Sequence, residues 1–277
     1  SHVDAVGNIV CAAAGEGKTR CWGRLGAPWN TYELPFSIDQ SEGILQVAVT
    51  QNTVCGLHGD GHVLCAGQSP NGVFGHNDTQ EAATLLVSGN FQSIKSSSNK
   101  TCARQRDEAN NIGTLTCWGD TSYQVFPGQN DSNDHTPFEL QLKLNDQRIS
   151  VQSFDVGDDH ICAVTLNPAK VMCWGRQTMQ AEPFPTDPRV IFDIPNNGQL
   201  APDSLCVGRQ HACVVLKTGA NDRPQVQCWG DNSFGQIQPT NPGGNLAPQV
   251  INLAMVPDKV FCADDHTCAI DSEGRNP

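Results

Sequence analysis

The sequence lacks several features that would point to a membrane or nucleic-acid protein. No apolar run approaches the roughly 20 residues that a helix needs to span a bilayer, so no direct membrane insertion is predicted. No basic run is present, and 17 Lys and Arg stand against 29 Asp and Glu, a formal net charge of −12. Nucleic acids and anionic membranes attract positive charge, so this balance argues against both as partners.

Motifs of common enzymes are missing as well. The chain has no Gly-x-Ser-x-Gly, no phosphate-binding glycine loop and no His-Glu-x-x-His. Carboxylates are plentiful, but their spacing singles out no pair for glycoside hydrolysis. We therefore predict no catalytic residue, no metal site and no cofactor. A secreted enzyme that acts on carbohydrate is the enzymatic alternative.

Cysteine is abundant, with 13 in 277 residues, yet the Cys-x-x-Cys spacing typical of zinc sites is absent. Most cysteines form pairs ten to fifteen residues apart. Regular pairing of this kind favours disulfides made in an oxidising compartment over metal ligands. The predicted bonds are Cys11–Cys21, Cys55–Cys65, Cys102–Cys117, Cys162–Cys173 and Cys213–Cys228.

The paired cysteines belong to a sequence repeat. The first cysteines recur every 44 to 60 residues, and glycine lies two residues after each second cysteine, four times in Cys-Trp-Gly. Glycines flank an acidic residue midway in two pairs, at residues 15–17 and 59–61, which is typical of hairpin turns. Pro168 would break a helix in the fourth pair. Each pair therefore predicts a β-hairpin whose facing cysteines lie within reach of a disulfide.

Three segments carry a resemblance to a known family. Residues 207–213, Val-Gly-Arg-Gln-His-Ala-Cys, precede Cys-Trp-Gly-Asp-Asn-Ser-Phe-Gly-Gln at 228–236, and related patterns recur at 156–162 and 263–268. These segments resemble repeats of the regulator of chromosome condensation family. The resemblance implies a β-propeller of four-stranded blades, usually seven. The cysteine-paired form is similar to the extracellular domains of crinkly-type plant receptor kinases.

We therefore expect an all-β propeller, a single domain over residues 1–277 with six visible repeats, the sixth of them incomplete. Cys268 opens the sixth repeat, and the tightest spacing would place its partner just after Pro277, so we expect the natural polypeptide to continue. The alternative is an inter-chain disulfide through Cys268. The repeats are expected at about 1–43, 44–90, 91–147, 148–201, 202–255 and 256–277.

Two further cysteines lie outside the hairpin pairs. Cys206 precedes Cys213 by seven residues, and Cys262 precedes Cys268 by six. The resemblance implies that both lie on the innermost strand of neighbouring blades. We predict a Cys206–Cys262 bridge between those blades.

Three histidines lie two residues before a cysteine, at His160, His211 and His266. A metal site of Asp158, Asp159 and His160 is conceivable. A structural role at each blade's turn is favoured, because the histidine recurs at one fixed position of the repeat. The Cys-Trp-Gly tryptophans are expected in the blade core, with a ring of exposed tryptophans for sugar stacking as the alternative.

The sequence also suggests sites of modification and contact. Asn77, Asn99 and Asn130 begin Asn-x-Ser/Thr sequons and are predicted glycosylation sites. Trp29 lies outside the repeat in a Gly- and Pro-containing segment and is a candidate contact residue. Residues 120–147 and 176–202 are long, polar inter-hairpin segments, where binding is expected.

These observations predict a non-enzymatic interaction or structural module that is secreted or lies on the cell surface. Its disulfide-stapled propeller would present loops to a protein or glycan partner in a receptor, matrix or surface assembly. Beside the carbohydrate-active enzyme, a nuclear or cytosolic exchange-factor-like protein with unpaired cysteines is the third hypothesis.

Overall fold

The computed structural model describes residues 2–13, 19–23, 43–67, 83–107, 112–120, 136–140, 142–166, 168–175, 188–195, 204–217 and 223–271. Across these residues the chain forms β-strands, β1 to β23, and contains no α-helix. No helix in this part of the chain is long and apolar enough to cross a membrane.

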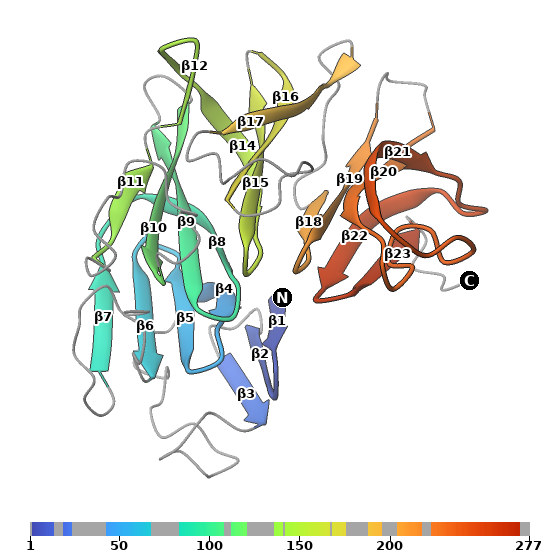
Figure 1. The fold of residues 1–277 in the computed structure, drawn as a ribbon. Helices are drawn as coiled ribbons and strands as arrows, with labels where there is room; N and C mark the ends of the chain where they lie inside the picture. Colours follow the sequence, from blue (N-terminus) through green and yellow to red (C-terminus); the bar gives the residue numbers. More distant parts are fainter. Residues whose placement is uncertain are drawn as a thin grey trace. The chain divides into compact units, whose positions relative to one another are not determined.

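The strands fall into two compact units, each described by itself. The first unit holds β1 to β11 in three antiparallel sheets, here called blades 1 to 3, and Figure 1 shows them in blue to green. Blade 1 is β1 (His2–Val6), β2 (Ile9–Ala13) and β3 (Thr19–Gly23). Blade 2 is β4 (Ile44–Val49), β5 (Thr53–His58), β6 (Val63–Gly67) and β7 (Ala83–Val87). Blade 3 is β8 (Phe91–Ser96), β9 (Lys100–Asp107), β10 (Ile112–Gly119) and β11 (Phe138–Leu140).

The second unit begins with a small hairpin of β12 (Lys143–Leu144) and β13 (Gln147–Arg148), followed by blades 4 to 6. Blade 4 is β14 (Ser150–Val156), β15 (His160–Leu166), β16 (Lys170–Gly175) and β17 (Arg189–Asp193). Blade 5 is β18 (Leu205–Val207), β19 (His211–Leu216), β20 (Gln225–Asp231) and β21 (Asn245–Ile251). Blade 6 is the pair β22 (Pro257–Ala263) and β23 (His266–Asp271).

In every sheet the strands are neighbours in chain order and antiparallel, and four of the blades have four strands. This succession of four-stranded sheets, together with the propeller structures reported below, confirms the all-β propeller that the sequence predicts. The blades lie within the predicted repeat ranges, while a single domain over residues 1–277 stays a prediction. The two long polar segments also contain strands, since β11 lies in 120–147 and β17 in 176–202.

The glycine of Cys-x-Gly is required by the backbone. Gly230 has φ +103°, which an L side chain rarely adopts, and a Cβ there would lie 2.5 Å from the carbonyl oxygen of Gln210. The same positive φ and the same backbone obstacle recur at Gly23, Gly67, Gly119 and Gly175. The third strand of each blade therefore ends where its chain passes directly over the turn between the first two strands.

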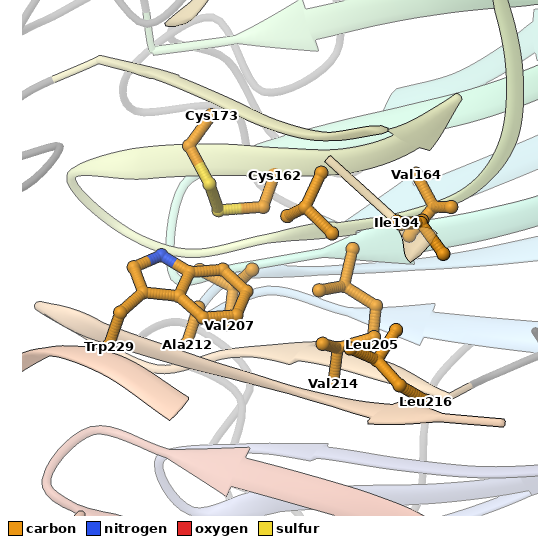
Figure 2. Close-up of a cluster of buried hydrophobic side chains, with 11 residues drawn as sticks. Cys162, Val164, Cys173, Ile194, Leu205, Val207, Ala212, Val214, Leu216 and Trp229 are labelled. Carbon is orange, nitrogen blue, oxygen red and sulfur yellow. A yellow bond between two sulfur atoms is a disulfide. The ribbon is translucent and has the colours of Figure 1, made fainter. Parts of the chain in front are cut away.

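Successive blades pack through their disulfides and tryptophans. Trp229 of blade 5 lies against the Cys162–Cys173 disulfide of blade 4, as Figure 2 shows, in a cluster with Val164 and Val214. Phe192 of blade 4 meets the indole edge-on, with ring centroids 5.7 Å apart. Trp118 of blade 3 packs in the same way on blade 2. Trp118 and Trp229 thus each join their own blade to the blade before it.

The predicted core position is wrong for one tryptophan. Trp118, Trp174 and Trp229 are buried, but Trp22 is 52% exposed. Blade 1 is the first sheet of its unit, and among the described strands of that unit no earlier blade exists for Trp22 to cover.

Candidate functional site

Six disulfides join pairs of strands, either within one blade or between two blades. Five lie within hairpins, where the paired cysteines face each other in register with Cα atoms 3.9–4.1 Å apart. The sixth, Cys206–Cys262, links blade 5 to blade 6 across a sequence separation of 56 residues. These are the pairs that the sequence predicts. Among the described cysteines Cys268 has no disulfide partner, and it is exposed.

The first strands of neighbouring blades are also linked by carboxylates. Asp155 of blade 4 accepts the backbone N–H of Val207 in blade 5 at 2.8 Å. Asp4 of blade 1 accepts the N–H of Val49 in blade 2 at 2.7 Å. Asp4 also lies 3.4 Å from the Ser96 hydroxyl of blade 3, and burial raises the pKa of its carboxyl. This carboxylate is occupied by structural hydrogen bonds and has the role of a link between blades.

Two of the three recurring histidines are buried at the blade turns. His160 is 3% exposed and His211 is fully buried, whereas His266 is exposed at the turn of blade 6. The carbonyl of His211 accepts the N–H of Gly208 at 2.8 Å, and its Nε2 lies 2.8 Å from Oγ1 of Thr267 in blade 6. The same turn bond joins Gly157 to His160 at 2.9 Å. The buried imidazole of His211 therefore ties its turn to the neighbouring blade.

Burial governs the charge of these histidines. Burial, and secondly the neighbouring His211, lower the pKa of His160 to about 4. Burial also lowers the pKa of His211. Both rings are therefore neutral at pH 7. Among the described residues no group of three or more His, Cys, Asp and Glu side chains is arranged to hold a metal ion.

The loop between β20 and β21 is the most highly organised polar feature of the second unit. Asn232 is fully buried, and its Oδ1 accepts the N–H groups of Ile237 at 2.9 Å and Gln238 at 2.7 Å. Its Nδ2 donates to the carbonyl of Asn241 at 2.9 Å. One amide side chain thus fixes three parts of the loop.

A second set of bonds fixes the start of the same loop. Asp231 accepts the hydroxyl of Ser233 at 2.6 Å and Nε2 of Gln236 at 3.0 Å. Gln236 Oε1 in turn accepts the N–H of Phe234 at 2.9 Å. The side chain of Phe234 is 73% exposed. The loop is rigid and holds this aromatic ring in solvent.

Some of the remaining predicted site residues lie outside the described part of the chain, and others lie within it. Trp29, Asn77 and Asn130 lie outside the described residues, as do most of the two long polar segments. Asn99 lies in the turn between β8 and β9 and is half-buried, and Thr101 of its sequon is fully buried. Glycosylation at the three asparagines and a contact at Trp29 stay predictions.

Sequence reasoning missed the linking carboxylates and the Phe234 loop. Asp4 and Asp155 each lie seven residues before the first cysteine of their hairpin, as Cys206 does. Aligning the repeats on that cysteine places these three residues at one position, although the other repeats carry Ala48, Lys95 and Phe261 there. The loop carries only a likeness to a family, and no local signal in Asp-Asn-Ser-Phe-Gly-Gln shows that the phenylalanine is exposed.

Comparison with known proteins identifies the repeat. Residues 203–236, which include β18 to β20 and the start of the Phe234 loop, match the model of the Regulator of chromosome condensation (RCC1) repeat. Human WBSCR16 is similar in structure, with 14% sequence identity and a TM-score of 0.76, over 96% of this chain and 70% of that chain. Prp20p from Saccharomyces cerevisiae has 15% identity and a TM-score of 0.73, over 96% and 68%.

The CRINKLY ectodomain of the Arabidopsis thaliana receptor kinase ACR4 is also similar. It has 17% identity and a TM-score of 0.56, over 96% of this chain and 72% of that chain. Likenesses at these identities concern the fold. Together with the six disulfides, they show that the chain resembles the regulator of chromosome condensation repeat family in its cysteine-paired form, similar to the crinkly-type ectodomains.

Proposed function

We propose that this chain is a non-enzymatic interaction module of the extracellular space, a single disulfide-stapled propeller domain that presents loops to a protein partner. The role is that of a scaffold in a cell-surface, matrix or receptor assembly. Its affinity resides in rigid loops between the strands, and its blades hold those loops in place.

The observation that carries this proposal is the pairing of the cysteines. Twelve of 13 cysteines are bonded, and five bonds occupy one position in successive hairpins. Disulfides persist in oxidising compartments and are rare where glutathione and thioredoxin keep thiols reduced. Nearly all the hairpin cysteines are buried, so these bonds belong to the core of each blade.

A protein partner is supported by the chemistry of the described surface. The carboxylates and histidines best placed for chemistry are used within the fold, as Asp4, Asp155 and His211 show. The propeller Prp20p is described with binding properties to Gsp1p and histones, so this architecture serves protein recognition in at least one similar structure. The acidic charge of this chain suits a partner that is not itself acidic.

The test is thiol alkylation of the protein taken directly from its natural source, separated into medium, cell-surface and intracellular fractions. We expect the protein in the medium or on the surface, with twelve cysteines that react only after reduction. Protein found in the nucleus or cytosol with all its cysteines reactive would overturn the proposal and favour the exchange-factor-like alternative. Turnover of an oligosaccharide by the purified protein would favour the enzyme.

A further inference from the structure

The most exposed large hydrophobic side chain of the described residues is Phe234. It stands on the loop from Asp231 to Gly244, between β20 and β21 of blade 5. Burial of a phenylalanine is worth about 2 kcal/mol or more, so leaving one in solvent forgoes stability. The ring makes no contribution to the hydrophobic core of blade 5.

The loop is held in one conformation before any partner arrives. Asn232 bonds the loop at both ends through its side chain, and its backbone N–H donates to the carbonyl of Gly244 at 2.9 Å. Ile237 is 3% exposed and packs in the hydrophobic cluster of blades 5 and 6. A ring fixed on such a loop loses little conformational freedom on binding, which is the advantage of a preorganised contact.

Phe234 belongs to a long stretch of chain that lacks charged residues. From Asn232 to Pro257 no residue is Asp, Glu, Lys, Arg or His, the longest such run in the sequence. Val250 on β21 and Val256 are 46% and 41% exposed in the same run. Interface cores are enriched in aromatic residues and depleted of charge, because burying an unpaired charge is costly.

We propose that Phe234 and the uncharged segment that contains it, residues 232–257, form the docking site for a partner protein that supplies an apolar pocket for the phenyl ring. The proposal rests on the proposed function and names the place where that function is exerted. Phe234 is the central anchor of this contact.

Three features of the surface favour this occupant over others. Several polar side chains of the loop are already used internally, as Asn232, Gln236 and the Gln238–Gln249 pair show, so these do not serve to bind sugar hydroxyls. Pro248 lies on β21, the outermost described strand of blade 5, and lacks the N–H that an added strand would need. A second copy carries the same charge of −12 and is repelled.

The experiment titrates labelled, disulfide-intact protein onto unpermeabilised cells of its source organism and measures saturable binding. We expect F234A to raise the Kd at least tenfold and F234R to raise it further, because it places a charge in the interface core. The matched control is Leu45→Ala in blade 2, a side chain that is also exposed, at 59%, and its Kd should stay within twofold. Equal melting temperatures and disulfide maps verify that all variants fold.

The outcomes separate this inference from the function on which it rests. Saturable binding that F234A and F234R leave unchanged overturns the docking site and leaves the interaction module intact. No saturable binding by the unmodified protein overturns both. Protease treatment of the cells should abolish binding, and loss after glycosidase treatment instead would assign a glycan and overturn the protein partner. A dimer in solution that F234A dissociates would assign a second copy and overturn it as well.

Discussion

Asp155 and Cys206 occupy the same position in successive blades, and each links its blade to the next one. Asp155 faces Cys162, and Cys206 faces Cys213, the first hairpin cysteine in each case. Asp155 accepts the N–H of Val207, while Cys206 bonds Cys262.

The residues that these links reach are equivalent too. Val207 directly follows Cys206, and Cys262 directly follows Phe261, which faces Cys268. Asp4 repeats the arrangement in the first unit, where it faces Cys11 and accepts the N–H of Val49. In blades 1, 4 and 5 this repeat position therefore carries either a carboxylate that bonds the backbone of the next blade or a sulfur that bonds a cysteine of the next blade.

This equivalence predicts the effect of removing the carboxylate. Asp155→Ala leaves the N–H of Val207 without its acceptor in a largely buried setting and should lower the free energy of unfolding by about 1–3 kcal/mol. Asp155→Asn keeps an acceptor oxygen and should cost less. Urea titration measures both.

The control is Asp193→Ala, which removes an exposed ion pair with Lys170 in the same unit and should cost well under about 1 kcal/mol. If Asp155→Ala and Asp193→Ala have the same stability, the carboxylate is not a link between blades.

A second prediction concerns the glycine of Cys-Trp-Gly. Gly230→Ala should destabilise the protein by more than about 3 kcal/mol, because its Cβ would meet backbone 2.5 Å away as well as suffer the strain of φ +103°. Gly244→Ala is the matched control, since Gly244 has φ +69° and nothing within 4 Å of a Cβ. Gly244→Ala should lower the free energy of unfolding only by the cost of the left-handed backbone conformation, roughly 1–2 kcal/mol. Thermal unfolding of both variants under one set of conditions separates the steric clash of the new Cβ from the strain of the positive φ. Similar losses of stability in the two variants would contradict the close approach of Gly230 to the carbonyl oxygen of Gln210.

The tryptophans offer a third test. Trp229→Ala removes the ring that packs on the Cys162–Cys173 disulfide in Figure 2, and should cost about 3–5 kcal/mol. Trp22 has the same place in its Cys-Trp-Gly motif but is 52% exposed, so Trp22→Ala should cost much less. Denaturant unfolding monitored by circular dichroism compares the two. Equal losses would mean that Trp22 is also covered by a blade in solution.

The sequence predicts the hairpins, the cysteine pairs and the propeller because those features repeat locally. A disulfide such as Cys162–Cys173 needs only two facing strands, and glycine and spacing mark both of them. Even Cys206–Cys262 follows from the repeat, since both residues precede a first cysteine by a similar distance.

Features that depend on the next blade could not be predicted in the same way. The exposure of Trp22 and the bond from Asp155 to Val207 are set by which sheet lies opposite, and the local sequence does not contain that information. Strand β11 lies in a polar segment and was not predicted, because its three residues are too few to show the alternation of apolar and polar residues that indicates a strand. The sequence does not predict the exposure of Phe234, because the loop that carries it is shaped by the hydrogen bonds of the buried Asn232 side chain to residues five and six positions further on.

The last prediction concerns acid sensitivity. His160 is neutral in the folded protein with a pKa of about 4, whereas an unfolded histidine titrates near 6.5. Between these two values the unfolded chain binds more protons, so stability must fall as the pH is lowered from about 6.5 to 4, by about 3 kcal/mol from this residue. The raised pKa of Asp4 acts with the opposite sign, because its folded form holds a proton more readily, but that contribution is the same in every variant. His160→Gln should therefore flatten the slope of unfolding free energy against pH in this window, whatever its effect at pH 7.5. Urea titrations of the unmodified protein and the variant at pH 7.5, 5.5 and 4 provide the comparison. A slope that His160→Gln does not alter would show that this imidazole is not buried in its neutral form.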